Sequence, residues 1–402
     1  MTHRSKILIS IASFVILAYA YAVPQYGQCS ETVIVGILHS EAYPYATMMK
    51  NSFSMALDEI NKEGGINGKP LQLVYANDQG KPKEGEQAVR QLVNESGAVM
   101  LVGAYQSSNT IQMANTANKL DRPLLVSTAA DDRVTQRKWR NVYRLNAPAS
   151  EYASGLEDFL LKKIKPKSMA IIYENSPFGT GSALRMMWFC RENNIDIQAI
   201  TPYHKERLKT DYFNRIIAPL EEDPPDVIYM VSYLDDGALL VKQLRELKIN
   251  ALLCGGAGGF THHKFIDKTG PLADKLLTAT LWTPQLRYDG TAEYYNQYTD
   301  RYGTPPDYHG AEAFSALLVA ANALDRAESF QPINIRAALD ATDMITPFGP
   351  VQVTSYGKDE RKNSLPTQVL QIIDGKFECI WPQEHVTSTF VEPPGWRNSM
   401  VE

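Results

Sequence analysis

Short apolar runs alternate with amphipathic segments along most of this chain. Residues 98–131 show the pattern most clearly, with apolar runs at 98–102 and 123–126. A polar turn follows the first run. Between this turn and the second run, apolar residues recur at helical spacing, namely Ile111, Met113, Ala114 and Ala117. Apolar runs of this length indicate buried strands, and the segment between them indicates a helix. The stretch therefore predicts a strand-helix-strand unit of a parallel sheet.

The same alternation occurs before and after this unit. We predict strands at 32–38, 71–76, 168–173, 195–200, 226–231 and 251–254, and helices at 48–62, 84–94, 152–163, 182–193, 212–220 and 236–247. The second series repeats the plan of the first, which indicates two similar α/β domains. Helices at 291–302, 311–327 and 335–341 follow, and Asp374-Gly375 predicts a tight turn between strands at 368–373 and 377–381.

Hydroxyl side chains follow both strands of the opening unit. Ser107 and Ser108 come at the expected start of a helix, where free N–H groups and the helix dipole favour an anionic group. Ser127, Thr128 and Ala129 follow the next strand. Because the carboxyl ends of parallel strands meet at one edge, these loops predict half of a small-molecule site. The alternative is that the serines only cap a helix and end a strand.

Aromatic residues and glycines occur in other loops between strands and helices. Tyr45, Tyr105 and Tyr233 could stack on a ligand, although each could also pack in the core. The glycine loop 255–259 suits close approach by a ligand or by the opposite domain, and it could equally be a simple turn. Phe178-Gly179-Thr180-Gly181-Ser182 lacks the third glycine of a dinucleotide loop, because Leu184 stands there, so we expect no cofactor.

Charge and motifs exclude several classes of function. The 402 residues carry a net charge of -5, with 40 basic and 45 acidic residues, so nucleic acid is not an expected partner. GxSxG, Walker and HExxH motifs are missing, which disfavours an enzyme. His262-His263 has no third ligand at metal spacing, so we expect no metal site.

The N-terminus has the features of an export signal. Arg4 and Lys6 precede an apolar segment at 7–17 and small residues that allow cleavage after Ala20 or Ala22, so 1–22 is predicted as a signal peptide. A retained anchor is the alternative. A lipid on Cys29 is not expected, since 26–28 does not fit a lipoprotein site. The four cysteines allow one disulfide, whose pairing stays open.

The chain resembles the leucine/isoleucine/valine-binding family, the type I periplasmic solute-binding proteins of ABC transporters. The resemblance covers about residues 31–385 and rests on ALDEIN leading into GGING (56–68), LVG with SSNT (101–110), PLLVS (123–127), Tyr143-Arg144, AIIY with Phe178-Gly179, and DVIY (226–229). The family's fold implies two Rossmann-like α/β lobes joined by a three-strand hinge, here expected at 143–148, 278–284 and 349–353. We place lobe 1 at 31–147 plus 279–350 and lobe 2 at 148–278 plus 351–390.

The resemblance also implies roles for individual residues. The hydroxyl that binds the ligand carboxylate falls on Ser107, the carbonyl that accepts the ligand ammonium on Ala129, and the two aromatic contacts on Tyr45 and Tyr233. Two matches fail: Asp131 stands where amino-acid binders have a threonine, and the glycine loop near Gly258 stands where they have an ammonium-binding glutamate.

An unpaired acid in a closed cleft is costly, so Asp131 should meet a cation or turn to solvent. We expect it to bind a ligand amino group, with Asp235 or Asp236 as second candidates. The alternative is a ligand that is no α-amino acid at all, such as an amide or an aromatic acid.

The resemblance implies a periplasmic monomer that captures a small polar ligand by hinge closure and passes it to an ABC permease in the inner membrane. The expected ligand is a branched-chain amino acid or a relative. The ligand-binding residues are expected to be Tyr45, Tyr105, Ser107, Ser108, Ser127, Thr128, Ala129, Asp131, Phe178, Tyr233 and Gly258. Alternatives are a binder of an amide or aromatic acid, and a sensing subunit of a receptor; an exported hydrolase is disfavoured.

Overall fold

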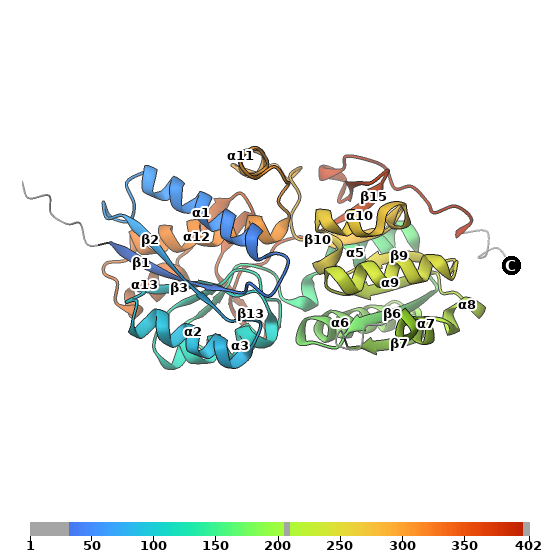
Figure 1. Ribbon diagram of the computed structural model, residues 1–402, viewed down its shortest axis with the longest axis horizontal. Coiled ribbons are helices and arrows are strands. Elements are labelled where there is room, and N and C mark those ends of the chain that lie inside the picture. The colour runs from blue at the N-terminus through green and yellow to red at the C-terminus, as the bar shows by residue number, and fades with distance from the viewer. Residues whose placement is uncertain (1–31, 205–209, 397–402) are drawn as a thin grey trace, which may run out of the picture. The chain divides into compact units, whose positions relative to one another are not determined.

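Two seven-stranded sheets form the framework of the protein in a computed structural model that describes residues 32–204 and 210–396. The expected signal peptide and Cys29 lie outside the described residues. Within residues 32–396, Figure 1 shows the first sheet and its helices on the left and the second on the right. This arrangement confirms the predicted class of two α/β lobes.

The strands of the first sheet are ordered β13-β14-β5-β4-β3-β1-β2, and β1 to β5 run parallel. Their bounds are β1 Val33–His39, β2 Leu71–Asn77, β3 Met100–Gly103, β4 Leu124–Val126, β5 Val142–Arg144, β13 Thr354–Tyr356 and β14 Asp359–Lys362. The helices of this lobe are α1 Ala46–Lys62, α2 Pro82–Asn94, α3 Ser107–Lys119, α4 Arg133–Gln136, α11 Thr291–Tyr302, α12 Tyr308–Arg326 and α13 Pro332–Asp340. A small hairpin, β11 Asp343–Thr346 with β12 Gly349–Gln352, completes the lobe.

The second sheet has the order β16-β15-β10-β9-β8-β6-β7. Its strands are β6 Ser168–Glu174, β7 Asp196–Tyr203, β8 Val227–Val231, β9 Leu252–Gly255, β10 Leu277–Thr280, β15 Gln368–Ile373 and β16 Lys376–Trp381. Its helices are α5 Ser154–Phe159, α6 Pro177–Glu192, α7 Thr210–Ile217, α8 Pro219–Glu222, α9 Leu234–Glu246 and α10 His263–Thr269. The predicted hairpin around Asp374-Gly375 is confirmed as β15–β16.

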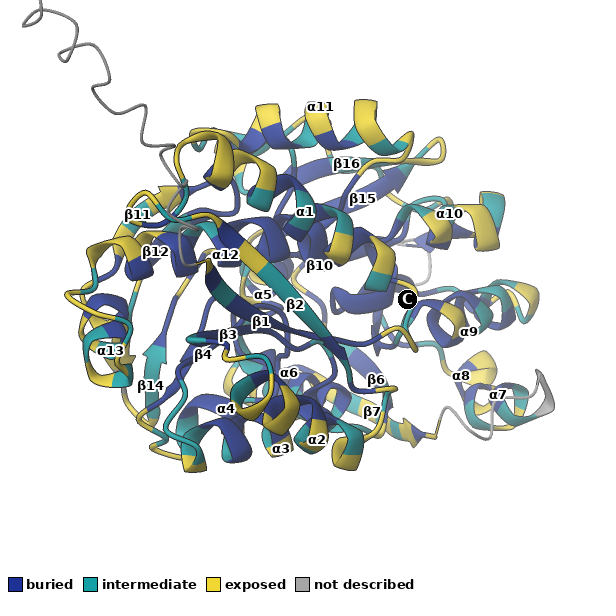
Figure 2. Ribbon diagram, turned by 60° about the vertical axis from the view of Figure 1, so that its left-hand side comes forward, coloured by how far each residue is buried: buried dark blue, intermediate teal, exposed yellow. Residues whose placement is uncertain are grey.

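Strand residues alternate between the two faces of each sheet, and in the central strands both faces are buried. In β6, Met169 and Ile171 join the core cluster that contains α5 and α6 residues, whereas Ala170 and Ile172 join the cluster under α7, α9 and α10. Figure 2 shows buried strands in the interior, with exposed residues on the outward faces of α2, α3 and α11. Burial on both faces explains why the strands read as continuous apolar runs.

The chain passes between the sheets three times, and one passage differs from the prediction. The passages after β5 and after β10 agree with the extended segments expected at 143–148 and 278–284. The third lies between β14 and β15, not at 349–353, because β13 and β14 extend the first sheet through pairing of Lys362 with Arg144. The boundary proposed at residue 351 therefore moves to the stretch between β14 and β15.

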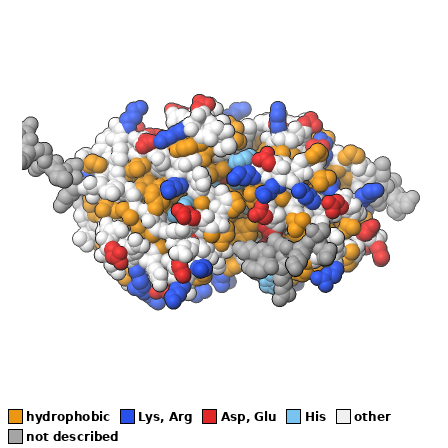
Figure 3. Space-filling model, in the orientation of Figure 1, with side chains coloured by type: hydrophobic (Ala, Val, Ile, Leu, Met, Phe, Trp, Pro, Cys, Tyr) orange, Lys and Arg blue, Asp and Glu red, His pale blue; other side chains and the backbone are white. Residues whose placement is uncertain are grey.

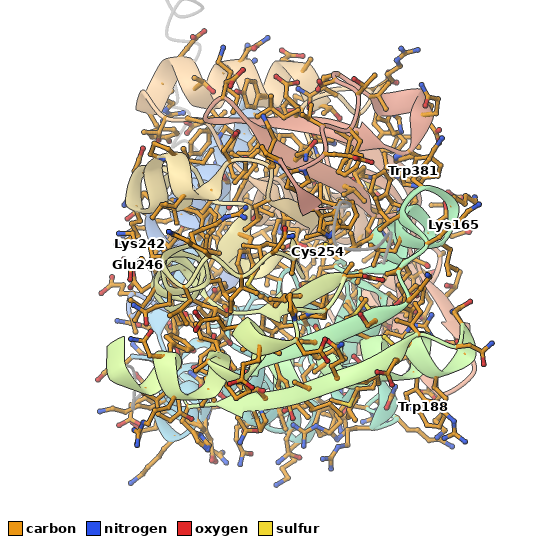
Figure 4. All side chains as sticks on the ribbon, turned by 90° about the vertical axis from the view of Figure 1, so that its right-hand side faces the viewer. Lys165, Trp188, Lys242, Glu246, Cys254 and Trp381 are labelled. Atoms are coloured by element: carbon orange, nitrogen blue, oxygen red, sulfur yellow. The ribbon has the colours of Figure 1, made fainter. Side chains whose placement is uncertain are left out.

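The described cysteines are Cys190, Cys254 and Cys379, and all three are buried free thiols. Burial raises the pKa of Cys190 to about 12 and that of Cys379 to about 11, so both thiols stay protonated at neutral pH. Figure 4 shows Cys254 in the interior of the second lobe and Trp188 at its edge. None of the three contributes to a disulfide.

Candidate functional site

A cavity of about 20 Å³ lies between loops of the two lobes. The first lobe provides residues after β3 and β4 and at the start of α12, and the second lobe provides the starts of α6 and α9. The lining residues are Tyr105, Ser107, Thr128, Ala130, Tyr152, Phe178, Tyr233, Tyr308 and His309. A volume this small is close to that of a single water molecule, so the walls nearly touch.

Five of the predicted residues line this cavity: Tyr105, Ser107, Thr128, Phe178 and Tyr233. A second cavity of about 280 Å³ adjoins it and shares Tyr105 and Tyr233. This second cavity is also lined by Tyr45 and by both alternative acids, Asp235 and Asp236. The structure therefore brings the predicted aromatic residues of both lobes together.

The first-lobe loops are fixed to each other by backbone bonds and one hydroxyl. The chain turns sharply after β3, where Gly103 has φ +118° and Ala104 φ +73°. Ala129 N–H then donates to Ala104 O at 3.2 Å, and Asp131 N–H donates to Ser107 Oγ at 3.1 Å. Ser107 is the first residue of α3, so its hydroxyl lies at the positive end of the helix dipole.

A buried arginine donates hydrogen bonds to backbone carbonyls of these loops. Arg144 is 1% exposed, its Nη1 donates to Ala129 O at 3.2 Å, and its Nη2 donates to Asp131 O. Burial lowers the pKa of Arg144. The carbonyl of Ala129, which the resemblance makes the acceptor of a ligand ammonium, is thus already bound to a cation of the protein, and Ala129 does not line the cavity.

The predicted role of Asp131 disagrees with its position. Its carboxylate is buried, but Arg133 binds it through Nε at 3.0 Å and Nη2 at 2.6 Å. Asp131 lines a separate groove of about 620 Å³ together with Asp132 and Arg133. The acid does meet a cation, as buried acids must, but the cation belongs to the protein. This ion pair disfavours Asp131 as the group that binds a ligand amine, and Asp131 does not line the interlobe cavity.

Three further predicted residues lie near the cavity without lining it. Ser127 Oγ lies 3.2 Å from Thr128 Oγ1, and Ser108 Oγ contacts Asn109 Oδ1 at 3.4 Å. Gly258 lies at the start of a single 3-10 turn and contacts the first lobe through its backbone.

The second-lobe wall is aromatic. Phe178 and Tyr233 have ring centroids 5.7 Å apart. Ser176 caps α6 by accepting from Gly179 N–H at 3.4 Å, which fixes the turn that carries Phe178. Behind this wall, Asp236 Oδ2 accepts from the Tyr203 hydroxyl at 2.5 Å and from Tyr233 N–H at 3.2 Å. Asp235 forms an exposed ion pair with Lys268.

The start of α12 provides site residues that the sequence prediction missed. The prediction begins this helix at Ala311, whereas the helix begins at Tyr308, so Tyr308 and His309 lie outside the predicted helix. Asp307 caps the helix by accepting from His309 N–H at 2.9 Å. An aspartate after Pro305-Pro306 is a standard helix-start signal that could have placed both residues. Tyr152 was placed in a helix without a role.

The pKa values of two buried acids, one on α12 and one at its cap, are shifted in opposite directions. Burial alone would raise the pKa of Asp307, but the adjacent His309 imidazole holds it below the usual value. Burial raises the pKa of Glu312 well above the usual value, although Thr128 and Asn146 lie close enough to lower it. Neither oxygen of Glu312 accepts a hydrogen bond of normal geometry. Asp307 is therefore ionised, and Glu312 tends to keep its proton.

Charge at the surface is mixed. On the face in Figure 3, basic and acidic side chains are interspersed over both lobes. Within the described residues, no group of three or more His, Cys, Asp or Glu could hold a metal ion. Helices long and apolar enough to cross a membrane are likewise missing from the described part of the chain.

Comparison with known proteins decides the family. The profile of a family described as "Periplasmic binding protein" matches residues 33–376. The chain belongs to this periplasmic binding protein family. Similar relatives include the Leu/Ile/Val-binding protein homolog 7 of Brucella melitensis, 25% identical over 88% of this chain and 92% of the relative. Homolog 8 of Brucella abortus is 27% identical over 82% of this chain and 84% of the relative.

Solved structures confirm the fold of this family member. A branched-chain amino acid transporter substrate-binding protein from Streptococcus pneumoniae, in complex with isoleucine, has a TM-score of 0.78 at 20% identity and covers 87% of this chain and 100% of its own. A solute-binding protein of an ABC transporter from R. palustris, in complex with benzoate, has a TM-score of 0.77 at 15% identity, over 90% of this chain and 98% of its own.

Proposed function

We propose that this protein is the extracytoplasmic solute-binding component of an ABC importer, which captures a small carboxylate such as a branched-chain amino acid or a relative. One observation carries the proposal: Ser107 and Thr128 face the aromatic wall of Phe178 and Tyr233 across an interlobe cavity. A hydroxyl at a helix start binds an anion well, and an aromatic wall excludes water from an apolar side chain.

The capture step is closure of the two lobes on the ligand. Ligand bound to the first lobe gains the second-lobe contacts only in the closed form, so it shifts the population toward closure. A permease in the inner membrane would then recognise the closed protein. Membership of the periplasmic family and the expected signal peptide at 1–22 support a periplasmic location, and we expect a monomer.

The cavity favours an aromatic or aliphatic acid without an amino group as a second candidate ligand. Among the described residues that line it, none is Asp or Glu. Asp131 and the carbonyl of Ala129 are engaged by arginines. A ligand ammonium would therefore lack a free acidic partner in this cavity.

Ligand titration tests the proposal. We expect L-leucine, L-isoleucine, L-valine or benzoate to raise the melting temperature and to bind in calorimetry. Ser107→Ala should weaken the binding of the acid about tenfold, because one hydrogen bond to a charged group is lost. Ser154→Ala is the matched control, because Ser154 also begins a helix, bonds Thr367 Oγ1 at 3.0 Å and lies outside the cavity. Equal losses in both variants would contradict the role of Ser107.

A further inference from the structure

Two first-lobe tyrosines bind one peptide segment of the second lobe. The Tyr45 hydroxyl donates to Gly258 O at 3.2 Å, and Gly258 N–H donates to the Tyr308 hydroxyl at 3.2 Å. Both tyrosines are buried, at 1% and 2% exposure. The N–H and C=O of a single residue are therefore both held from the opposite lobe.

A histidine ring connects the two tyrosines. His309 stacks on Tyr45 with ring centroids 3.8 Å apart and an interplanar angle of 27°, and on Tyr308 at 3.9 Å and 26°. Its Nδ1 lies 3.0 Å from Asp307 Oδ1, so the ionised carboxylate orients the imidazole. The three rings form one stack, anchored to the start of α12.

The second lobe presents Gly258 in a preset conformation. Gly258 has φ +62°, and a Cβ there would lie 3.1 Å from both Phe178 Cζ and Ser232 O. A Cβ on Gly259 would lie 2.2 Å from the backbone of Tyr233. The glycines let this loop pack directly on the aromatic wall, so its peptide groups have little freedom to move.

We propose that Tyr45, His309 and Tyr308 form a clamp that couples the ligand to closure, an inference that rests on the proposed function. His309 and Tyr308 line the cavity, and Tyr45 lines the adjoining one. A ligand that packs against His309 fixes the ring between the two tyrosines, and the hydroxyls then hold Gly258. His309 is a positioning residue in this clamp, and the tyrosines make the contacts between lobes.

The two hydroxyls contribute unequally. Gly258 O also accepts from Thr261 Oγ1 at 3.1 Å, so it keeps a partner without Tyr45. Among the described residues, Tyr308 is the only acceptor for Gly258 N–H. Removal of the Tyr308 hydroxyl therefore leaves a buried donor unpaired in the closed form, which costs more than the loss of one bond to a satisfied acceptor.

Phenylalanine variants test the clamp. With L-isoleucine and benzoate as probes, we expect Tyr308→Phe to weaken binding about tenfold and Tyr45→Phe about threefold, chiefly through faster dissociation. Tyr294→Phe is the control: Tyr294 is equally buried in the first lobe, but its hydroxyl bonds Ser52 Oγ at 2.9 Å. Dissociation constants come from calorimetry and dissociation rates from stopped flow. Variants at Tyr45 and Tyr308 that behave like the control would overturn the clamp.

Small-angle scattering separates the clamp from a simple ligand contact. At saturating ligand, the Tyr45→Phe/Tyr308→Phe double variant should have a larger radius of gyration than wild type, whereas loss of a ligand contact alone leaves this radius unchanged. If wild type binds none of the amino acids or benzoate, the proposed function fails. The clamp, which rests on that function, fails with it, whereas a double variant that binds a probe yet keeps the wild-type radius of gyration at saturating ligand overturns the clamp alone.

Discussion

The two walls of the cavity differ in the chemistry that builds them. The first-lobe side contains buried ionisable side chains, namely Arg144, Asp307 and Glu312, of which Arg144 bonds the carbonyls of Ala129 and Asp131. The second-lobe wall rests on rings and bare backbone, namely Phe178, Tyr233 and the glycine loop, with Asp236 held by Tyr203. Under the proposed function, we expect the first lobe to bind the polar group of the ligand and the second lobe to close over its apolar part.

The largest expected effect comes from removing the buried cation of the first lobe. Arg144→Met leaves Ala129 O and Asp131 O without their charged donor, and each such bond stabilises by about 1.5–3 kcal/mol. We expect the free energy of unfolding to fall by about 3–5 kcal/mol in urea titrations. Arg140→Met is the control, because Arg140 is exposed and pairs with Asp121 at the surface, where ion pairs contribute about 0–1 kcal/mol. Similar losses in the two variants would contradict the first-lobe network.

The buried acid of the first lobe should make stability depend on pH. The folded pKa of Glu312 is raised, so its contribution is fully present below the unfolded pKa of about 4.3 and is lost as pH rises through the folded pKa. Relative to Glu312→Gln, wild type should lose up to about 1.4 kcal/mol per pH unit above pH 4.5. Urea titrations at pH 5, 6 and 7 measure this difference. A difference that stays constant with pH would show that Glu312 is ionised in the fold.

A smaller effect is expected when the support of the second-lobe wall is removed. The Tyr203 hydroxyl lies 2.7 Å from Ser232 Oγ and 2.5 Å from Asp236 Oδ2. Tyr203→Phe should lower the free energy of unfolding by about 1.5–3 kcal/mol, because a buried carboxylate loses a donor. Tyr298→Phe serves as control, since Tyr298 is also buried but its hydroxyl accepts from the neutral amide of Asn51 at 3.3 Å. A loss larger than that of Arg144→Met would reverse the proposed contrast between lobes.

The strands and helices of both lobes could be predicted from the sequence because each depends on the local pattern of apolar and polar residues. Strands buried on both faces appear as apolar runs, and Asp374-Gly375 marks its hairpin by itself. The strands β13 and β14 were missed because they are short and polar, and their place depends on the pairing of Lys362 with Arg144, far away in the chain.

The site was only partly readable for the same reason. Ser107, Thr128 and Tyr233 follow strands, so their place at the sheet edge could be predicted. The partner of Asp131 could not be chosen from spacing alone, even though Arg133 is two residues away, because a ligand cation would satisfy the same acid. Arg144 reaches the Ala129 carbonyl from another strand, and no local pattern shows that contact.

Calorimetric titration with paired ligands tests the central claim most directly: L-leucine against L-leucinamide, and benzoate against benzamide. If the first lobe reads a carboxylate at Ser107 and the start of α3, at least one acid of these pairs binds more than about tenfold tighter than its amide. An amide that binds as tightly as its acid in both pairs, or a protein that binds none of the four, would contradict the account.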